Sequence, residues 1–134
     1  MLLTFALAMV ACNTTDDIEA IFSGQTWYLT YIKNGDEKTT PKNGKIYSID
    51  FNKNAQFEAR VPGGGVIKGR WHADGSDKHS FNCTNVTYEG FISGDSIANN
   101  MLNILQNATS YNGDTNWLHI IKDKNTEMQF YNLN

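Results

Sequence analysis

The sequence predicts a mainly β protein: a single antiparallel, barrel-like curled sheet of about seven or eight strands with one helix packed on it at residues 95–107. Three observations carry this prediction. Short segments rich in aromatic and β-branched residues recur along the chain with turn residues between them. Several of these segments alternate between apolar and polar side chains, which is typical of strands with one buried face. Near the C-terminus the period becomes helical.

The first half of the chain contains the clearest strands. Thr26–Lys33 (TWYLTYIK) is rich in aromatic and β-branched residues, which favour strands. Ile46–Asn52 and Ala55–Val61 alternate between apolar and polar residues around a short turn, and this pattern predicts a hairpin. The apolar faces of the hairpin consist of Tyr47, Ile49 and Phe51 in its first strand and Phe57, Ala59 and Val61 in its second.

The second half of the chain adds two strands, the helix and a closing hairpin. The strands are expected at Val66–Ala73 and His79–Tyr88, and the hairpin at Trp117–Lys122 and Thr126–Leu133. Asp95–Asn107 follows a helical period. The apolar stripe of this helix consists of Ile97, Met101, Ile104, Leu105 and Ala108. We expect the stripe to pack against the sheet.

The N-terminus resembles the export signal of a bacterial lipoprotein. Leu2–Ala11 is an uncharged apolar run, which is shorter than the roughly 20 residues of a membrane-spanning helix but has the length of the apolar region of a signal peptide. The run ends in Met9-Val10-Ala11-Cys12, which is similar to a lipobox. In that motif the cysteine thiol receives a diacylglyceryl group, and cleavage before the cysteine makes it the new N-terminus. The basic residue that usually follows the initial methionine is missing.

These observations divide the chain into three parts. Residues 1–11 are expected to be a signal peptide. Residues 12–21 are expected to carry a lipid on Cys12 and to form a tether or short helix, and residues 22–134 to form one β-barrel domain. The acidic pair Asp16-Asp17 leaves two interpretations open: a signal for surface export, or the N-terminus of the short helix.

Charge and export signal together indicate the location and the partners. The formal net charge is −3, which argues against nucleic-acid binding because that function requires a clustered basic surface. We expect a monomer that is attached through its lipid to the bacterial cell envelope. The expected site is the outer membrane, facing the periplasm or the outside, where an envelope protein is the expected macromolecular partner.

Residue types that catalyse reactions or bind metals do not form a recognisable pattern. The three histidines, His72, His79 and His119, lack the close spacing of metal ligands, and no nucleophile or phosphate-binding motif is present. Cys83 is expected to be a small buried side chain, with a reactive thiol as the alternative. The sequence therefore predicts a protein that is not an enzyme and has no metal or cofactor.

Tryptophans are the remaining candidates for a binding site. Trp27, Trp71 and Trp117 lie on predicted strands and could line a ligand cavity, because a barrel of about eight strands can enclose one small ligand. The alternative interpretation is a core that these side chains fill.

Several short motifs, in their order along the chain, resemble the META domain, which is found in small bacterial envelope lipoproteins linked to heat shock. The motifs are Gly24-Gln25-Thr26-Trp27-Tyr28-Leu29, Ile49-Asp50-Phe51, Gly69-Arg70-Trp71, and, after a helix that ends in Leu105, Trp117-Leu118 with Met128-Gln129-Phe130. The resemblance covers residues 22–131 and departs from the family around Cys83. A lipocalin-like lipoprotein is the close competitor, since it shares the barrel and an early Gly-x-Trp.

The resemblance implies a compact barrel with one helix and a role in the cell envelope. Together with the export signal, it leads to the hypothesis of a lipid-anchored, non-enzymatic envelope protein with a structural, stress-related or protein-binding role. The lipocalin resemblance implies the alternative function, a carrier of a small apolar ligand.

Overall fold

The computed structural model describes residues 15–75, 79–90 and 94–133. Cys12 and the expected signal peptide lie outside this part of the chain. The described residues form two helices and nine strands. In chain order these are α2 (Thr15–Phe22), β1 (Thr26–Asn34), β2 (Glu37–Thr39), β3 (Ser48–Phe51), β4 (Gln56–Arg60), β5 (Val66–Ala73), β6 (Phe81–Glu89), α3 (Ser96–Asn107), β7 (Ser110–Gly113), β8 (Trp117–Asp123) and β9 (Thr126–Tyr131).

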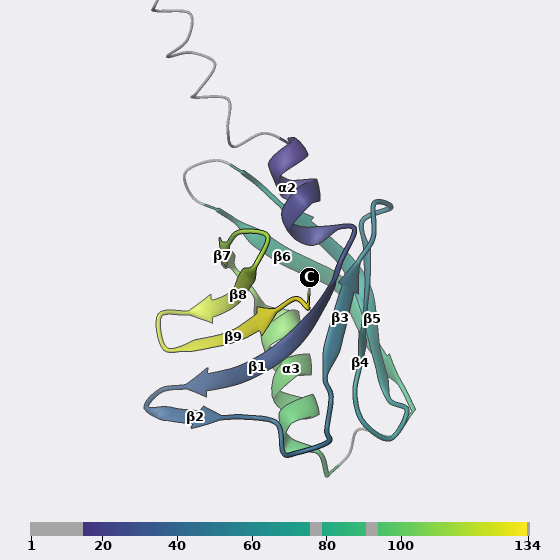
Figure 1. Cartoon of the computed structure of the whole chain (residues 1–134), viewed down its shortest axis with the longest axis vertical. Coiled ribbons are helices and arrows are strands. Elements are labelled where there is room, and N and C mark those ends of the chain that lie inside the picture. The colour runs from purple at the N-terminus through teal and green to yellow at the C-terminus, as the bar shows by residue number, and fades with distance from the viewer. Residues whose placement is uncertain (1–14, 76–78, 91–93, 134) are drawn as a thin grey trace, which may run out of the picture.

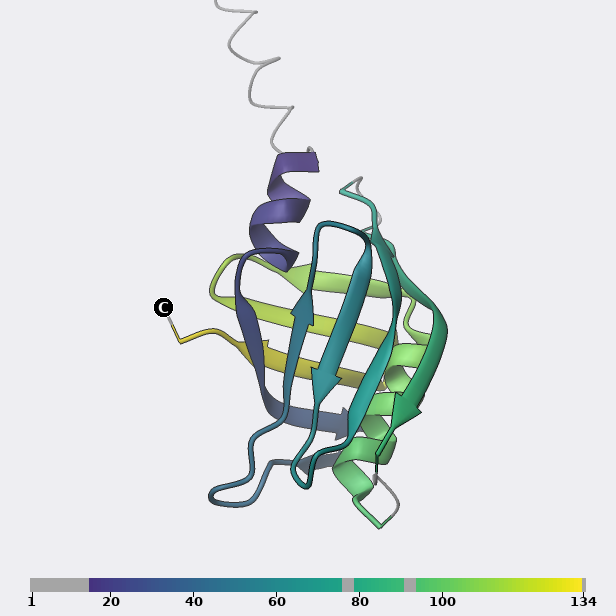
Figure 2. The same cartoon turned by 90° about the vertical axis from the view of Figure 1, so that its right-hand side faces the viewer.

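The strands form one antiparallel sheet that curls into a half-barrel (Figures 1 and 2). Its order is β6-β5-β4-β3-β1-β9-β8-β7, and β2 pairs with β1 outside this path. The two edge strands meet at one end, where Ser80 and Ser110 form a β-bridge and the amide of Phe81 donates to the carbonyl of Thr109 (3.1 Å). The predicted fold class is thus confirmed, and the curl shortens the free edges of the sheet.

Helix α3 covers part of the gap between the two edges, because it contacts β6 on one side and β8 and β9 on the other. The side-chain carboxylate of Asp95 caps the helix by accepting from the amide of Ala98 (3.0 Å). The hydroxyl of Tyr47 donates to the same carboxylate (2.8 Å) and thereby ties the helix to the sheet. All members of the predicted apolar stripe are buried, so the prediction for this helix is confirmed.

The core lies on the concave side of the sheet. The predicted apolar face of the β3–β4 hairpin points inward, as does one face of the β8–β9 hairpin, and the apolar side chains on these two faces have exposed fractions of 5% or less. The buried apolar members of the two hairpins are Tyr47, Ile49, Phe51, Phe57, Ala59, Val61, Leu118, Ile120, Met128 and Phe130.

Two irregularities bend the sheet. In β1 the pairing with β9 shifts between Leu29 and Tyr31, and the hydroxyl of Thr30 is buried there with no hydrogen-bond partner among the described residues. In β5 the pairing with β6 shifts next to Gly69. A Cβ atom at Gly69 would lie 2.7 Å from a ring carbon of Phe57, so no larger side chain fits at this bend.

Two strands, β2 and β7, were not predicted from the sequence. β2 has three polar residues and pairs only with β1, so it has no apolar face that could be recognised. β7 has four residues, of which Tyr111 is the buried one. Strands this short give too few positions for a period of two to be detected.

Candidate functional site

Helix α2 closes one end of the half-barrel (Figure 2). It ends before Gly24, whose φ of +89° is a conformation that glycine adopts without steric cost. The carbonyl of Ile21, in its last turn, accepts from Nε2 of Gln25 (2.8 Å) and from Nε1 of Trp27 (3.0 Å). These bonds hold the helix against the start of β1 and give the N–H group of the buried indole its hydrogen-bond partner.

The side chain of Phe22, at the end of α2, fills this end of the core. Its ring centroid lies 5.0 Å from that of Trp71, 5.1 Å from those of Phe51 and Tyr111, and 5.4 Å from that of Phe81. Phe22 is completely buried. One helical residue therefore holds together strands from both halves of the sheet.

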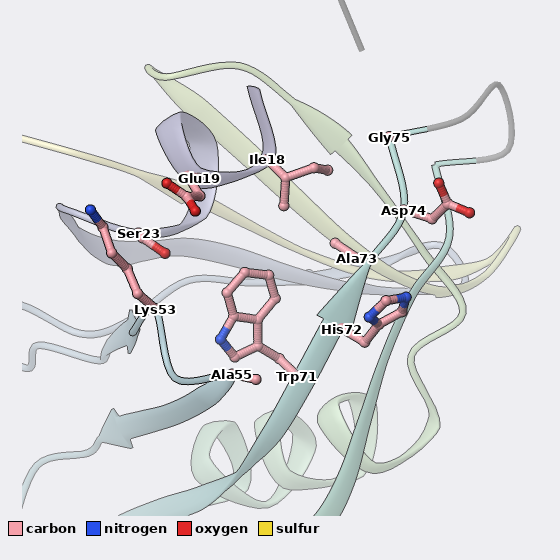
Figure 3. Close-up of a pocket in the computed structure, with 10 residues that line it drawn as sticks. All are labelled: Ile18, Glu19, Ser23, Lys53, Ala55, Trp71, His72, Ala73, Asp74 and Gly75. Carbon is pink, nitrogen blue, oxygen red and sulfur yellow. The ribbon is translucent and has the colours of Figure 1, made fainter. Parts of the chain in front are cut away.

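A groove opens beside α2 (Figure 3), and we call it the mouth groove. Its volume is about 700 Å³, which lies within the range of small-molecule sites. The walls come from three segments: α2, the turn between β3 and β4, and the end of β5 with the residues that follow it. The side chains that shape the groove are Ile18, Glu19, Ser23, Lys53, Trp71 and His72.

Trp71 forms the aromatic wall of the mouth groove. One face of its indole stacks on Phe22 with an interplanar angle of 29°, and its Nε1 donates to the carbonyl of Asn52 (3.1 Å). Figure 3 shows the ring projecting into the groove near Ser23 and Ile18. The indole is thus held in place before any ligand arrives, and the face away from Phe22 is the one that it can offer.

Ser23 supplies a polar group to the opposite wall. The residue is 7% exposed, and its hydroxyl has no hydrogen-bond partner in the described part of the chain. Figure 3 shows the hydroxyl oxygen directed toward the indole of Trp71. A buried hydroxyl without a partner costs about 1–3 kcal/mol, and a ligand hydroxyl that bonded to it would remove that cost.

Side chains of both charges border the groove. Glu19 extends from α2 and Lys53 from the turn between β3 and β4, and both are exposed (Figure 3). His72 lies on the rim and is exposed as well. Asp74, which follows β5, adds a second exposed carboxylate, so the border has two carboxylates and one ammonium and disfavours an anion.

The structure does not bring together the three tryptophans that the sequence singled out. Trp27 is completely buried in the core, and Trp117 lies on the convex face, 48% exposed, with its ring 6.4 Å from that of Tyr131. Of the three, Trp71 lines the mouth groove. Sequence reasoning missed Ser23 and Lys53, because a serine after a short helix and a lysine in a turn carry no distinguishing signal.

The three histidines, all in the described part of the chain, do not form a common site. His79 stacks on Tyr111 (5.1 Å between centroids), and Nε2 of His119 lies 2.8 Å from Nε2 of Gln129. Among the described residues, no three histidine, cysteine or carboxylate side chains gather as metal ligands.

Cys83 lies on β6 opposite Trp71 in β5 and is partly packed against the core. Burial raises the pKa of its thiol to about 12, which keeps the thiol protonated at neutral pH. Since the thiolate is the reactive form, this environment favours the interpretation of Cys83 as a small apolar side chain.

Neither helix in the described ranges is both long and apolar enough to cross a bilayer. Nothing among the curated proteins matches this chain.

Comparison with solved structures identifies a similar fold. A crystal structure of a DUF4847 family protein from Bacteroides vulgatus ATCC 8482 aligns with a TM-score of 0.67 and 25% sequence identity, and the alignment covers 85% of this chain and 96% of that one. A second finding concerns the sequence: residues 13–132 match the domain of unknown function DUF4847.

These findings correct the expected family. The motifs that resembled a META domain or a lipocalin are tryptophans, leucines and glycines at strand positions, such as Trp27 in the core and Gly69 at a sheet bend. Any small antiparallel barrel needs bulky residues inside and glycines at bends, so these motifs are typical of the architecture and do not identify the family. Because the match extends over nearly the whole chain, this protein belongs to the DUF4847 family.

Proposed function

We propose that this protein is a lipid-anchored protein of the bacterial cell envelope that acts as a non-enzymatic binding module. The observation that carries the proposal is the lipobox-like Met9-Val10-Ala11-Cys12 directly after an apolar run. The family match begins at residue 13, so the apolar run and Cys12 lie outside the matched region. An apolar segment outside the domain is what an export signal needs.

The distance between the anchor and the domain supports a short stalk. Helix α2 begins at Thr15, three residues after Cys12. Three extended residues reach about 10 Å, so a lipid on Cys12 would keep the α2 end of the barrel close to the bilayer surface. The mouth groove, which α2 borders, would then lie at the membrane-proximal end of the protein.

The shape of the groove favours binding at the mouth over carriage of an apolar ligand inside the barrel. A carrier of that kind needs an enclosed apolar space, whereas the mouth groove is open to solvent and has polar and charged side chains at its border. The interior side chains of α3 and of the two hairpins pack tightly, with exposed fractions of 8% or less.

The anchor is tested by expressing the full chain in a Gram-negative host with a clickable palmitate analogue and measuring its intact mass. We expect the wild type to lose residues 1–11, to gain lipid mass and to enter the membrane fraction. Cys12→Ala should do none of these, while the control Cys83→Ala should behave as the wild type. An unprocessed, unlabelled wild type would show the proposal to be wrong.

A further inference from the structure

We infer that the mouth groove binds a neutral saccharide, with one sugar ring against the indole of Trp71 and a ring hydroxyl bonded to Ser23. This inference deepens the proposed function, because it names the class of ligand that the binding module takes. It rests on the proposed function only for the place where the protein meets this ligand. The binding itself depends on the groove alone.

The aromatic wall suits a sugar ring. A β-glucose ring carries its hydroxyls around its rim and presents C–H groups on its two faces, so it stacks on a flat aromatic surface by dispersion and burial of apolar area. The indole of Trp71 is held by Phe22 behind it and by the bond from Nε1 to Asn52. Because the platform is already fixed, stacking costs little side-chain entropy.

The polar wall suits a hydroxyl. The Ser23 side chain can both donate and accept one hydrogen bond, and it is 7% exposed with no partner in the described residues. This hydroxyl is already closed off from solvent, so a hydrocarbon ligand would leave it without a partner and would gain nothing from it. A sugar hydroxyl has the same dual capacity and satisfies it.

The charges at the border suit a neutral molecule with many hydroxyls. The carboxylate of Glu19 accepts hydrogen bonds and the ammonium of Lys53 donates them, so hydroxyls can use both. A phosphate or a carboxylate ligand would meet one lysine but two carboxylates, Glu19 and Asp74, at the same groove. The volume of about 700 Å³ leaves room for one or two sugar rings.

The test follows the three indole N–H signals of the ¹⁵N-labelled full chain by NMR in a detergent without a sugar headgroup. The probes are glucose and cellobiose, each added to about 20 mM, which detects binding down to millimolar affinity. We expect the Trp71 signal to shift saturably, while the signals of buried Trp27 and of Trp117 on the convex face stay in place. Sorbitol, which has the hydroxyls of glucose but no ring, should cause no saturable shift.

Two variants separate binding from stability. Ser23→Ala should weaken cellobiose binding about fivefold, the value of one hydrogen bond, while its Tm equals or exceeds that of the wild type because a hydroxyl without a partner is removed. Thr30→Val is the matched control: among the described residues it removes the second buried hydroxyl without a partner, which lies outside the groove, and it should leave the affinity unchanged.

The inference is overturned if neither sugar shifts the Trp71 signal, if sorbitol binds as well as glucose, or if Ser23→Ala binds cellobiose as tightly as the wild type. Saturable binding of laurate in place of sugars would also overturn it and would favour the apolar carrier. The NMR assay does not depend on Cys12. Absence of lipid labelling together with intact sugar binding would therefore contradict the proposed lipid anchor alone. Intact lipid labelling without sugar binding would contradict the saccharide ligand alone.

Discussion

The thiol of Cys83 is protected by its surroundings in β6. Burial raises its pKa to about 12, so at pH 8 it has about a thousandth of the thiolate of an ordinary cysteine. In Cys12→Ala protein, where Cys83 is the remaining cysteine, we expect Ellman's reagent to react correspondingly slowly until urea unfolds the chain. Rapid reaction of the folded protein would contradict the burial of this thiol.

The hydroxyl of Tyr47 makes the fold sensitive to high pH. Its burial and its bond to Asp95 raise its pKa to about 12, above the ordinary value of 10. Between these values the unfolded chain releases the proton and the folded chain keeps it, so the free energy of unfolding falls as pH rises from 10 toward 12. Below pH 10 this contribution is fully present.

Tyr47→Phe tests this contribution. At pH 8 we expect the variant to be less stable than the wild type by about 1 kcal/mol, because one buried hydrogen bond is lost. The difference should shrink as urea unfolding is repeated up to about pH 11, since the wild type alone loses the Tyr47 contribution there. A difference that stays constant with pH would show that Tyr47 is not the group responsible.

At the scale of elements, α2 belongs to the folded core mainly through Phe22, with Ile18 and Ile21 packed beside it. Phe22 is completely buried among four aromatic rings, so Phe22→Ala should lower the free energy of unfolding by about 3–5 kcal/mol. Leu133→Ala, at a residue that is 70% exposed, should change it by less than about 0.5 kcal/mol. Urea unfolding measures both. Equally small losses of stability for Phe22→Ala and Leu133→Ala would mean that α2 packs only loosely on the sheet.

Local periodicity explains which elements could be predicted. The β3–β4 hairpin and α3 were found because every inward position in them is apolar, so the pattern in the sequence and the burial in the structure coincide. β2 and β7 were missed because they are short and are defined by their partners, β1 and β8. The mouth groove was missed for a related reason. Its walls, α2, the β3–β4 turn and the end of β5, come together only in the folded chain, through packing around Phe22 and the bond from Trp71 to Asn52.

At the scale of the whole molecule, the sheet has two ends, and the proposed lipid anchor would place only one of them near the bilayer. Figures 1 and 2 show α2 at one end and the loop between β2 and β3 at the other. β5, with eight residues, spans about 25 Å between these ends. If a lipid on Cys12 holds the protein, the turn between β3 and β4 lies near the bilayer and the β2–β3 loop lies well away from it, beyond the reach of a stalk of about 10 Å.

Two exposed asparagines in turns provide a matched pair for measuring this orientation. Asn54 lies in the β3–β4 turn and Asn43 in the β2–β3 loop. We would replace each with cysteine in a lipidated Cys83→Ala background, attach the same fluorophore, and reconstitute the protein in vesicles that carry spin-labelled headgroups. Quenching falls steeply beyond about 10–15 Å, so the label at Asn54 should be quenched strongly and the label at Asn43 weakly, because the rigid sheet separates them by about 25 Å. Equal quenching at the two positions would mean that the residues between Cys12 and α2 do not hold the barrel upright, and the mouth groove would then be as accessible from the periplasmic or outer solution as from the membrane surface.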